Sequence, residues 1–271
     1  MEIELQQVQY EFGLACDIGR ARKGGPNQDT AAVVLPRPAE SWHPPLLLVA
    51  DGLGRYQGGA LASQTVVDAF TQAFKQSQHP ADYPALMERC AQIAHRQVRA
   101  LGERDAALAL MGSTIAAAVL HRGTLFVLNV GDSRAYLLNE AGIRQVSQDH
   151  SWAAAQERAG LLTAAEARTH PNRNRLTMAI TAKRAMIEIY CAEEKLEPDD
   201  VVLLCSDGLW SVVPLTLIRA AAAELPPQAA ADKLVSMANS SAGPDNISVV
   251  IARRAGIERK GAAAGVQDTG P

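Results

Sequence analysis

The chain has 271 residues, 48% of them hydrophobic, and its 26 Lys and Arg against 29 Asp and Glu give a formal net charge of −3. The absence of a clustered basic run argues against nucleic-acid binding, and no apolar stretch approaches the roughly 20 residues that span a bilayer. The acidic N-terminus also lacks the apolar core of a signal peptide. We therefore expect a soluble, cytoplasmic protein with no nucleic-acid or membrane partner, and a monomer by default. Four scattered cysteines without a C-x-x-C pair favour reduced side chains over disulfides.

The first part of the chain predicts two strands followed by two helices. The strands are expected at 31–35 and 45–50, on either side of a proline-rich turn. One helix is expected from Gly58 to about 77 and another at about 84–103. In the second helix, apolar residues recur at alternating steps of four and three, as on the buried face of a helix.

Three strands are expected next, at about 113–120, 125–130 and 134–139. Both connections between them are short, which favours antiparallel hairpins. Residues 151–180 then interrupt the strand pattern with a short helix, a second helix opened by the capping-box sequence Thr163-Ala-Ala-Glu166, and a polar run. We expect this segment to form a flap outside the sheets.

The last part of the chain returns to strands and helices. Strands are expected at about 186–191, 201–206 and 246–252, and helices at about 214–224 and 227–240. Strand runs beside paired helices, joined by hairpins instead of crossovers, favour an α+β fold over a doubly wound parallel sheet. We expect one domain over residues 1–254 and a disordered tail, rich in Gly and Ala, over residues 255–271.

Three apolar strands deliver an aspartate to their ends. Asp51, Asp132 and Asp207 each follow an apolar run, and glycine comes directly after Asp51 and Asp207. A buried carboxylate without a partner is costly. Several of them at one place are best explained by bound cations, and oxygen ligands suit Mg²⁺ or Mn²⁺.

In chain order, these and three further motifs resemble the blocks of the PPM (type-2C) metal-dependent Ser/Thr protein phosphatases of bacterial type, over roughly residues 12–253. A lone Asp-Gly pair is more often a turn, but six blocks in the family's order are a specific signal. The resemblance implies a four-layer α-β-β-α sandwich, with two central antiparallel sheets flanked by helix pairs and a flap at about 151–180. The blocks are Asn27-Gln28-Asp29, Val49-Ala50-Asp51-Gly52, Met111-Gly112-Ser113-Thr114, Val130-Gly131-Asp132-Ser133-Arg134, Cys205-Ser206-Asp207-Gly208 and Gly243-Pro244-Asp245-Asn246.

The resemblance also implies two Mn²⁺ or Mg²⁺ ions, with a third ion in some bacterial members. Asp51 would bridge the first two ions and the Gly52 carbonyl would bind the second. Asp207 and Asp245 would complete the shell of the first ion. Asp132, together with Asp207, would form the third site.

Arg22 ends a Gly-Arg-Ala-Arg run that matches the family's phosphate-holding arginine. A guanidinium suits this role because it can hold two phosphate oxygens at once. The spacing to the Asn-Gln-Asp block is about two residues longer than in the family, so Arg20 or Lys23 is an alternative. In the flap, Arg173 and Arg175 are candidates for guiding an anionic phosphopeptide, with solvated surface charge as the competing interpretation.

Several residues around these blocks depart from the family or have a supporting role. Gln28 replaces the usual Glu, so it can still hold a water on the second ion but adds no charge, and we expect weaker binding of that ion. Asp29 is expected to orient waters or to serve the structure, and Asn246 to fix its turn. Arg55 and Tyr56 replace a Gly and a His, and either reach the substrate or pack on the surface.

The run Asp149-His150-Ser151 matches the family's block before the flap. Adjacent residues on an extended chain point to opposite faces, so these three side chains cannot form a catalytic triad. A structural role is therefore expected.

The resemblance implies a protein serine/threonine phosphatase that hydrolyses phosphoserine and phosphothreonine by in-line attack of a metal-bridging hydroxide, without a phospho-enzyme. Its partners would be phosphorylated proteins, with an opposing Ser/Thr kinase as a natural counterpart. One alternative is a catalytically silent, phosphoprotein-binding regulator, which Gln28 and the unusual arginine spacing favour. Another is a hydrolase of small phosphorylated metabolites.

Overall fold

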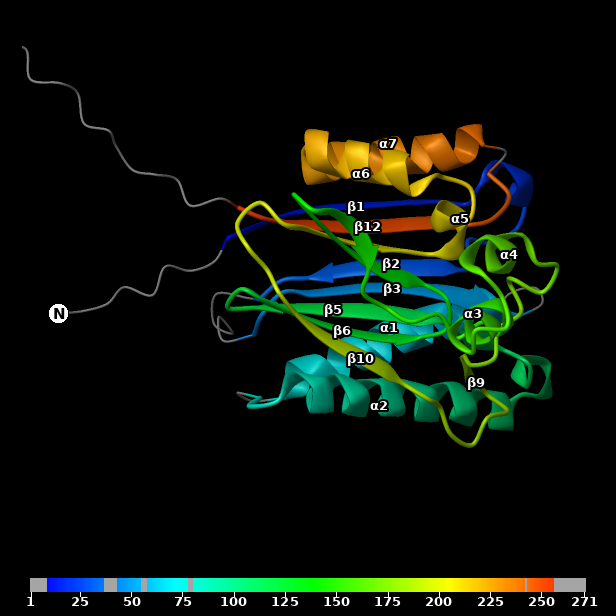
Figure 1. Ribbon diagram of the computed structural model, residues 1–271. Coiled ribbons are helices and arrows are strands. Elements are labelled where there is room, and N and C mark those ends of the chain that lie inside the picture. The colour runs from blue at the N-terminus through cyan, green and yellow to red at the C-terminus, as the bar shows by residue number, and fades with distance from the viewer. Residues whose placement is uncertain (1–8, 37–42, 55–57, 78–79, 242, 256–271) are drawn as a thin grey trace, which may run out of the picture.

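The computed structural model describes residues 9–36, 43–54, 58–77, 80–241 and 243–255. Two antiparallel sheets lie face to face, and a pair of helices covers the outer face of each (Figure 1). Helices α1 (Gly58–Gln76) and α2 (Tyr83–Arg104) cover one sheet, and α6 (Leu215–Glu224) and α7 (Pro227–Ser240) cover the other. This is the expected four-layer α-β-β-α sandwich. None of the helices in the described ranges has the length and apolar character that a bilayer crossing needs.

Every strand pair in the two sheets is antiparallel. The first sheet has the order β1 (Tyr10–Asp17), β12 (Ile247–Arg254), β11 (Val201–Cys205), β7 (Arg134–Asn139) and β8 (Gly142–Gln145). The second has the order β10 (Tyr190–Lys195), β6 (Thr124–Val130), β5 (Ile115–His121), β3 (Leu46–Leu53), β4 (Gly112–Ser113) and β9 (Ile180–Thr181), and β2 (Asp29–Val34) also pairs with β3.

The first five residues of β3 are all apolar because the strand is covered on both faces. Side chains alternate between the two faces of a strand, and here both faces are covered. Leu46 and Leu48 pack under α1 and α2, whereas Leu47 and Val49 pack against the opposite sheet. Both sets are fully buried, so the first part of the strand is a continuous hydrophobic run that leads to Asp51, which still lies within β3.

One expected hairpin is wrong. The connection at 121–123 does join a hairpin, β5 to β6, but the connection at 131–133 carries the chain from one sheet to the other. Both edges of β6 are already occupied, by β5 and β10, so β7 pairs with β11 and β8 in the other sheet. Gly131, with φ of 106°, supplies the left-handed backbone at which the chain leaves β6.

Two strand assignments also needed the tertiary structure. The strand expected at 186–191 lies at 190–195, where β10 pairs residue by residue with β6. This edge strand is half-exposed, so its limits follow from its partner and not from its own hydrophobicity. Strand β1 at 10–17, which pairs with β12, was not expected.

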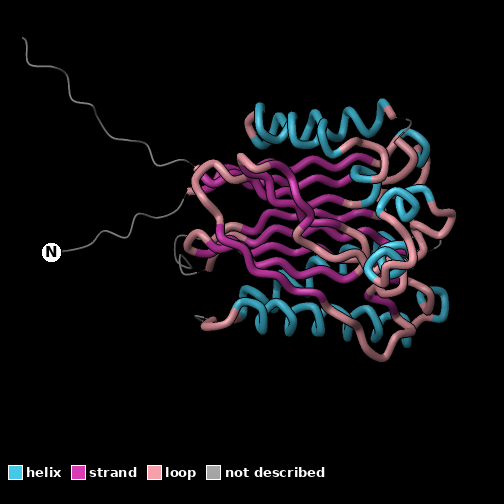
Figure 2. Tube along the Cα trace, in the orientation of Figure 1, coloured by secondary structure: helices cyan, strands magenta, loops and turns pink. Residues whose placement is uncertain are grey.

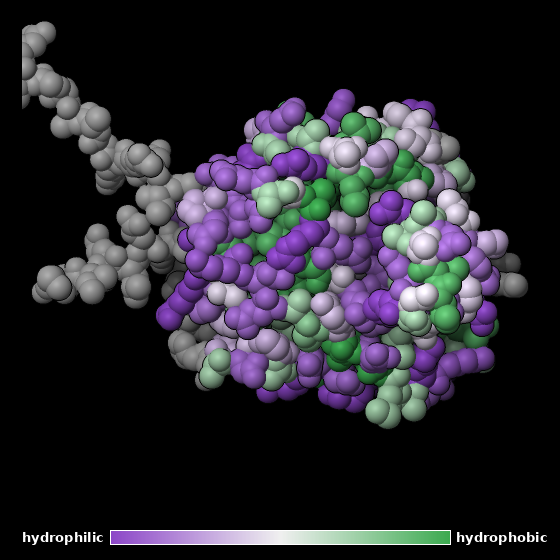
Figure 3. Space-filling model, in the orientation of Figure 1, coloured by the Kyte–Doolittle hydropathy of each residue, from purple (hydrophilic) through white to green (hydrophobic). Residues whose placement is uncertain are grey.

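Residues 151–179 lie outside the two sheets, at one end of the sandwich, and residue 180 begins β9 (Figures 1 and 2). They contain α3 (Trp152–Arg158) and α4 (Ala164–Thr169), and the expected capping box of Thr163 and Glu166 is present. Figure 3 shows hydrophobic side chains gathered over this segment, where Leu161 is 70% exposed. Its movement as a flap stays a prediction. The expected tail, beyond Ala255, lies outside the described residues.

Candidate active site

The aspartates singled out from the sequence come together at the end of the sandwich that also carries α3 and α4. Asp51 lies in β3 and pairs with Asp29 of β2 across the ladder. Asp132 lies in the turn between the two sheets, and Asp207 begins the short helix α5 (Asp207–Trp210), separated from the end of β11 by one residue. Asp245 precedes β12. Five carboxylates from distant parts of the chain therefore share one neighbourhood.

Their mutual electrostatic effect places Asp51 at the centre of this group. Its pKa is raised well above the ordinary value, first by burial and then by the negative charges of Asp29, Asp207, Asp132 and Asp245. Like charges at short range disfavour ionisation, as does removal from water. The group is therefore poised to accept positive charge.

Asp29 and Asp207 are affected in the same direction. Burial raises the pKa of Asp29 to about 7, although Ser206 Oγ donates a hydrogen bond to its Oδ2 over 2.6 Å. Burial and then the charge of Asp245 raise the pKa of Asp207 to about 6. Oδ1 of Asp29 and Oδ1 of Asp207 are both buried without a hydrogen-bond partner among the described residues. Such orphaned oxygens indicate that a ligand completes the site.

The donor set fits hard divalent cations, because its oxygens are carboxylate oxygens and their charges are mostly uncompensated. As placed, however, no three His, Cys, Asp or Glu side chains in the described part of the chain already converge as ion ligands. The carboxylates are near enough to perturb one another but not preassembled. The carboxylate of Asp245 is already engaged, because its Oδ2 accepts from Arg22 Nη2 over 2.7 Å.

The backbone of Asp51 is held by two hydrogen bonds to Thr114. Its N–H donates to Thr114 Oγ1 over 3.0 Å, and its carbonyl accepts from the N–H of Thr114 over 2.8 Å. The next residue, Gly52, has no room for a side chain, since a Cβ would overlap the carbonyl of Gly59 and lie 2.5 Å from that of Gln28. The glycine is thus required by close backbone approach, which fixes the end of β3.

Arg22 forms an ion pair with a carboxylate of this cluster. It ends the short 3-10 helix η1 (Arg20–Arg22) and makes the ion pair with Asp245, with its side chain 49% exposed. Arg20 and Lys23 are exposed and make no ion pair with a cluster carboxylate in the described ranges. The geometry supports Arg22 among the three alternatives.

Gln28 and Asn246 tie the segment after η1 to the start of β12. Asn246 Oδ1 accepts from the N–H of Gln28 over 2.9 Å, and its Nδ2 donates to the Ile18 carbonyl over 2.8 Å. The side chain of Gln28 donates through Nε2 to the Gly54 carbonyl over 3.2 Å. Asn246 therefore fixes the local backbone, and Gln28 contacts the loop that follows Asp51.

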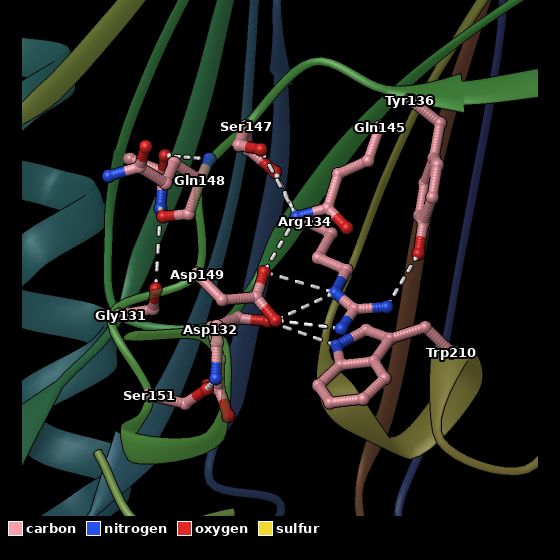
Figure 4. Close-up of polar contacts among 12 residues, drawn as sticks. Gly131, Asp132, Arg134, Tyr136, Gln145, Ser147, Gln148, Asp149, Ser151 and Trp210 are labelled. Carbon is pink, nitrogen blue, oxygen red and sulfur yellow. Dashed lines mark hydrogen bonds and ion pairs between the residues drawn. The ribbon is translucent and has the colours of Figure 1, made fainter. Parts of the chain in front are cut away.

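The Asp149-His150-Ser151 block has three separate structural contacts and no triad. Asp149 forms an ion pair with Arg134 (Figure 4). His150 Nδ1 accepts from the N–H of Gly131 over 3.1 Å, and Ser151 Oγ caps α3. These side chains diverge, as their positions on an extended chain require.

The two flap arginines are exposed, and neither forms an ion pair with a cluster carboxylate in the described part of the chain. Arg173 and Arg175 lie in the turn region after α4, where the main-chain carbonyl of Arg175 accepts from the N–H of Trp152 over 2.8 Å. Arg55 and Tyr56 lie outside the described residues. Arg134 has no predicted role from the sequence, although it lies in one of the family's blocks, and Trp210 is not among the predicted site residues. The position of Arg134 could be noticed locally only because a charged residue begins a strand that is otherwise mostly hydrophobic.

A protein-family model described as "Protein phosphatase 2C" matches residues 18–241. The serine/threonine phosphatase Stp of Listeria monocytogenes is 30% identical over 214 residues, which cover 78% of this chain and 84% of that protein. PstP of Mycobacterium tuberculosis, named as a serine/threonine protein phosphatase, is 31% identical over 208 residues, 76% of this chain and 40% of that protein.

Solved structures agree with these sequence matches. The crystal structure of the Mycobacterium tuberculosis phosphatase PstP/Ppp superposes with a TM-score of 0.81 at 27% identity, covering 91% of this chain and 99% of that one. The PstP catalytic domain in complex with two manganese ions superposes with a TM-score of 0.78 at 26% identity, covering 91% and 98%. The chain belongs to the protein phosphatase 2C family.

Proposed function

We propose that this chain is a metal-dependent protein serine/threonine phosphatase that hydrolyses phosphoserine and phosphothreonine in proteins. The observation that carries the proposal is the gathering of five carboxylates around Asp51, beside the guanidinium of Arg22. A cluster of this kind neutralised by cations can bind a phosphate dianion, whereas the carboxylates alone would repel it.

We assign two Mn²⁺ or Mg²⁺ ions to this cluster, with a third ion as a further assignment. Asp51 would contact both of the first two ions, the Gly52 carbonyl the second, and Asp207 and Asp245 the first. Asp132 and Asp207 would hold the third. Bound ions of this type stabilise the charge of the phosphoryl group and make water a strong nucleophile at neutral pH. The two manganese ions in the PstP complex support the first part of this assignment.

The protein's own groups position the reactants. Arg22 would hold the phosphate oxygens and, in doing so, exchange Asp245 for the substrate. Asp29, hydrogen-bonded by Ser206, would orient water beside Asp51. A cysteine nucleophile is disfavoured, because burial raises the pKa of Cys90 to about 12 and that of the fully buried Cys205 even further. Direct attack by water, without a phospho-enzyme, is the reaction consistent with these groups.

The substrates are proposed to be folded or extended phosphoproteins. The exposed Arg173 and Arg175, and the hydrophobic surface around Leu161, offer contacts for a polypeptide beyond the phosphate. An opposing Ser/Thr kinase, a monomeric state and a cytoplasmic location belong to the same proposal. We also propose that residues 1–254 act as one domain, because side chains from both sheets form one shared core layer.

The test is Mn²⁺-dependent turnover of p-nitrophenyl phosphate and of a phosphothreonine peptide. Asp51→Asn is expected to lower kcat at least about 100-fold, since it removes the group shared by both ions. Asp200→Asn, at the opposite end of β11, serves as the control for loss of a buried carboxylate and should retain activity. Peptide binding without turnover would indicate the silent regulator instead, and turnover confined to small phosphate esters would indicate a metabolite hydrolase.

A further inference from the structure

All three guanidinium nitrogens of Arg134, near the carboxylate cluster, donate hydrogen bonds. It begins β7, one residue after Ser133, and its side chain is 20% exposed. Its Nε donates to both carboxylate oxygens of Asp149 over 3.1 Å, its Nη2 donates to Oδ2 over 2.7 Å, and its Nη1 donates to Tyr136 Oη over 3.0 Å (Figure 4). The plane of the guanidinium is therefore fixed.

Trp210 lies against this fixed plane. The guanidinium carbon of Arg134 is 3.5 Å from the centre of the indole ring, a stacked cation–π contact. At its edge, the indole Nε1 donates to the main-chain carbonyl of Asp132 over 3.0 Å. Trp210 is also the last residue of α5, the helix that Asp207 begins. One side chain thus connects the backbone of Asp132 to the helix of Asp207.

Asp149, which holds Arg134, is itself held by contacts that do not involve Asp132 or Asp207. Asp149 Oδ1 accepts from Gln145 Nε2 over 2.7 Å, and the Asp149 carbonyl accepts from Arg158 Nη1 of α3 over 3.1 Å. None of these side chains is among the proposed ion ligands or phosphate contacts. The network meets the proposed ion ligands where Trp210 contacts the Asp132 carbonyl and ends the helix that Asp207 begins.

We propose that Trp210, held by Arg134 and Asp149, is a positioning residue that sets the separation of Asp132 from Asp207 and so the affinity of the cation site these two carboxylates form. The inference rests on the proposed function, because it needs that site to bind an ion. Partners that hold metal ligands in place typically change metal affinity by about 10- to 100-fold when they are removed.

Trp210→Phe is the decisive variant, because it keeps an aromatic ring for Arg134 and removes the indole N–H. Mn²⁺ binding to the full chain is measured by isothermal titration calorimetry, with thermal denaturation as the check on folding. The weakest Mn²⁺ site, identified as the one that Asp132→Asn abolishes, is expected to lose about tenfold in affinity. The tighter sites should stay within about twofold of the wild type on the same scale.

Trp152→Phe in α3 is the matched control and should leave every Mn²⁺ affinity unchanged. Arg134→Lys removes the paired hydrogen bonds to Asp149 and the planar group that stacks on Trp210. It should therefore weaken the same site at least as much as Trp210→Phe. An unchanged isotherm for Trp210→Phe, or an equal loss at all sites, overturns the inference. So does an isotherm for Asp132→Asn that matches the wild type. Failure of the wild-type chain to bind Mn²⁺ at all would instead overturn the proposed function, and this inference with it.

Discussion

Gln28 carries an amide where a carboxylate is usual in the family, and its contacts suggest what the amide does. Its Nε2 donates to the Gly54 carbonyl in the loop after Asp51. A glutamate cannot donate this bond and would add a charge to an already acidic cluster. Gln28→Glu should therefore lower the melting temperature of the metal-free protein. With ions bound, the same charge should lower the Mn²⁺ concentration for half-maximal activity by about fivefold, the effect of about 1 kcal/mol of Coulomb attraction.

Gln28→Ala separates the two effects, since it removes the hydrogen bond without adding charge. It should lower the metal-free melting temperature and leave the Mn²⁺ requirement unchanged or higher. Thermal denaturation in chelator and a Mn²⁺ titration of p-nitrophenyl phosphate hydrolysis measure both quantities. A Gln28→Glu variant that needs more Mn²⁺ than the wild type would contradict this account of the position.

The choice among Arg22, Arg20 and Lys23 is also a question of single residues. Only Arg22 is joined to the cluster by an ion pair in the described part of the chain. Arg22→Ala should lower kcat/KM for a phosphothreonine peptide by about 10- to 100-fold, the loss expected for hydrogen bonds to a charged group. Arg20→Ala and Lys23→Ala, compared in the same steady-state assay, should each remain within about twofold. A larger loss for either of these would move the phosphate contact to that residue.

A residue of the candidate site could be predicted from the sequence only where its neighbours along the chain indicate its role. Asp51 and Asp207 each follow an apolar run and precede glycine, so the sequence itself indicates a carboxylate held by a buried strand. The contact of Trp210 with the Asp132 carbonyl joins residues 78 positions apart. No pattern of spacing encodes such a contact, because it depends on the turn that moves the chain between sheets.

At the scale of elements, α4 offers a local test of the proposed flap. Thr163 caps its first turn, and Glu166 completes the box through a 2.8 Å bond from the Thr163 N–H. Thr163→Ala should weaken the helix by about 1 kcal/mol, which corresponds to about a fivefold increase in local opening. Hydrogen exchange over 160–170 should accelerate accordingly, with little change in the global melting temperature. Thr169→Ala, at the other end of the same helix, is the control and should not accelerate exchange.

The helices of the sandwich were predictable because each presents one apolar face with helical spacing. The strands were less so. A short connection such as 131–133 indicates only that two strands are near, and the occupied edges of β6 decided that they do not pair. In the same way, β10 takes its limits from the register with β6. Partner availability is a property of the assembled sheet, which the sequence of a single strand does not contain.

At the scale of the whole molecule, the sandwich concentrates negative charge at one end, and this has a measurable effect on stability. The pKa of Asp29 is about 7 and that of Asp207 about 6, against an ordinary value of 3.8. Groups whose pKa is higher in the folded state favour folding when they are protonated. Their contribution is complete below pH 3.8 and is lost as the pH rises through about 6 to 7. The metal-free protein should therefore lose this stabilisation between about pH 4 and pH 7.

Asp51→Asn isolates the effect from the rest of the chain, because it removes the central charge while keeping the shape of the side chain. In metal-free buffer at pH 8, this variant should melt at least about 3 °C above the wild type, and the difference should shrink towards pH 4.5. Added Mn²⁺ should make the wild type melt above Asp51→Asn, since the ion binds the folded wild type more tightly than the folded variant. Asp200→Asn should show no such reversal. If Asp51→Asn melts below the wild type at pH 8 without metal, the carboxylates are not in mutual repulsion, and the cation site argued from that repulsion loses its basis.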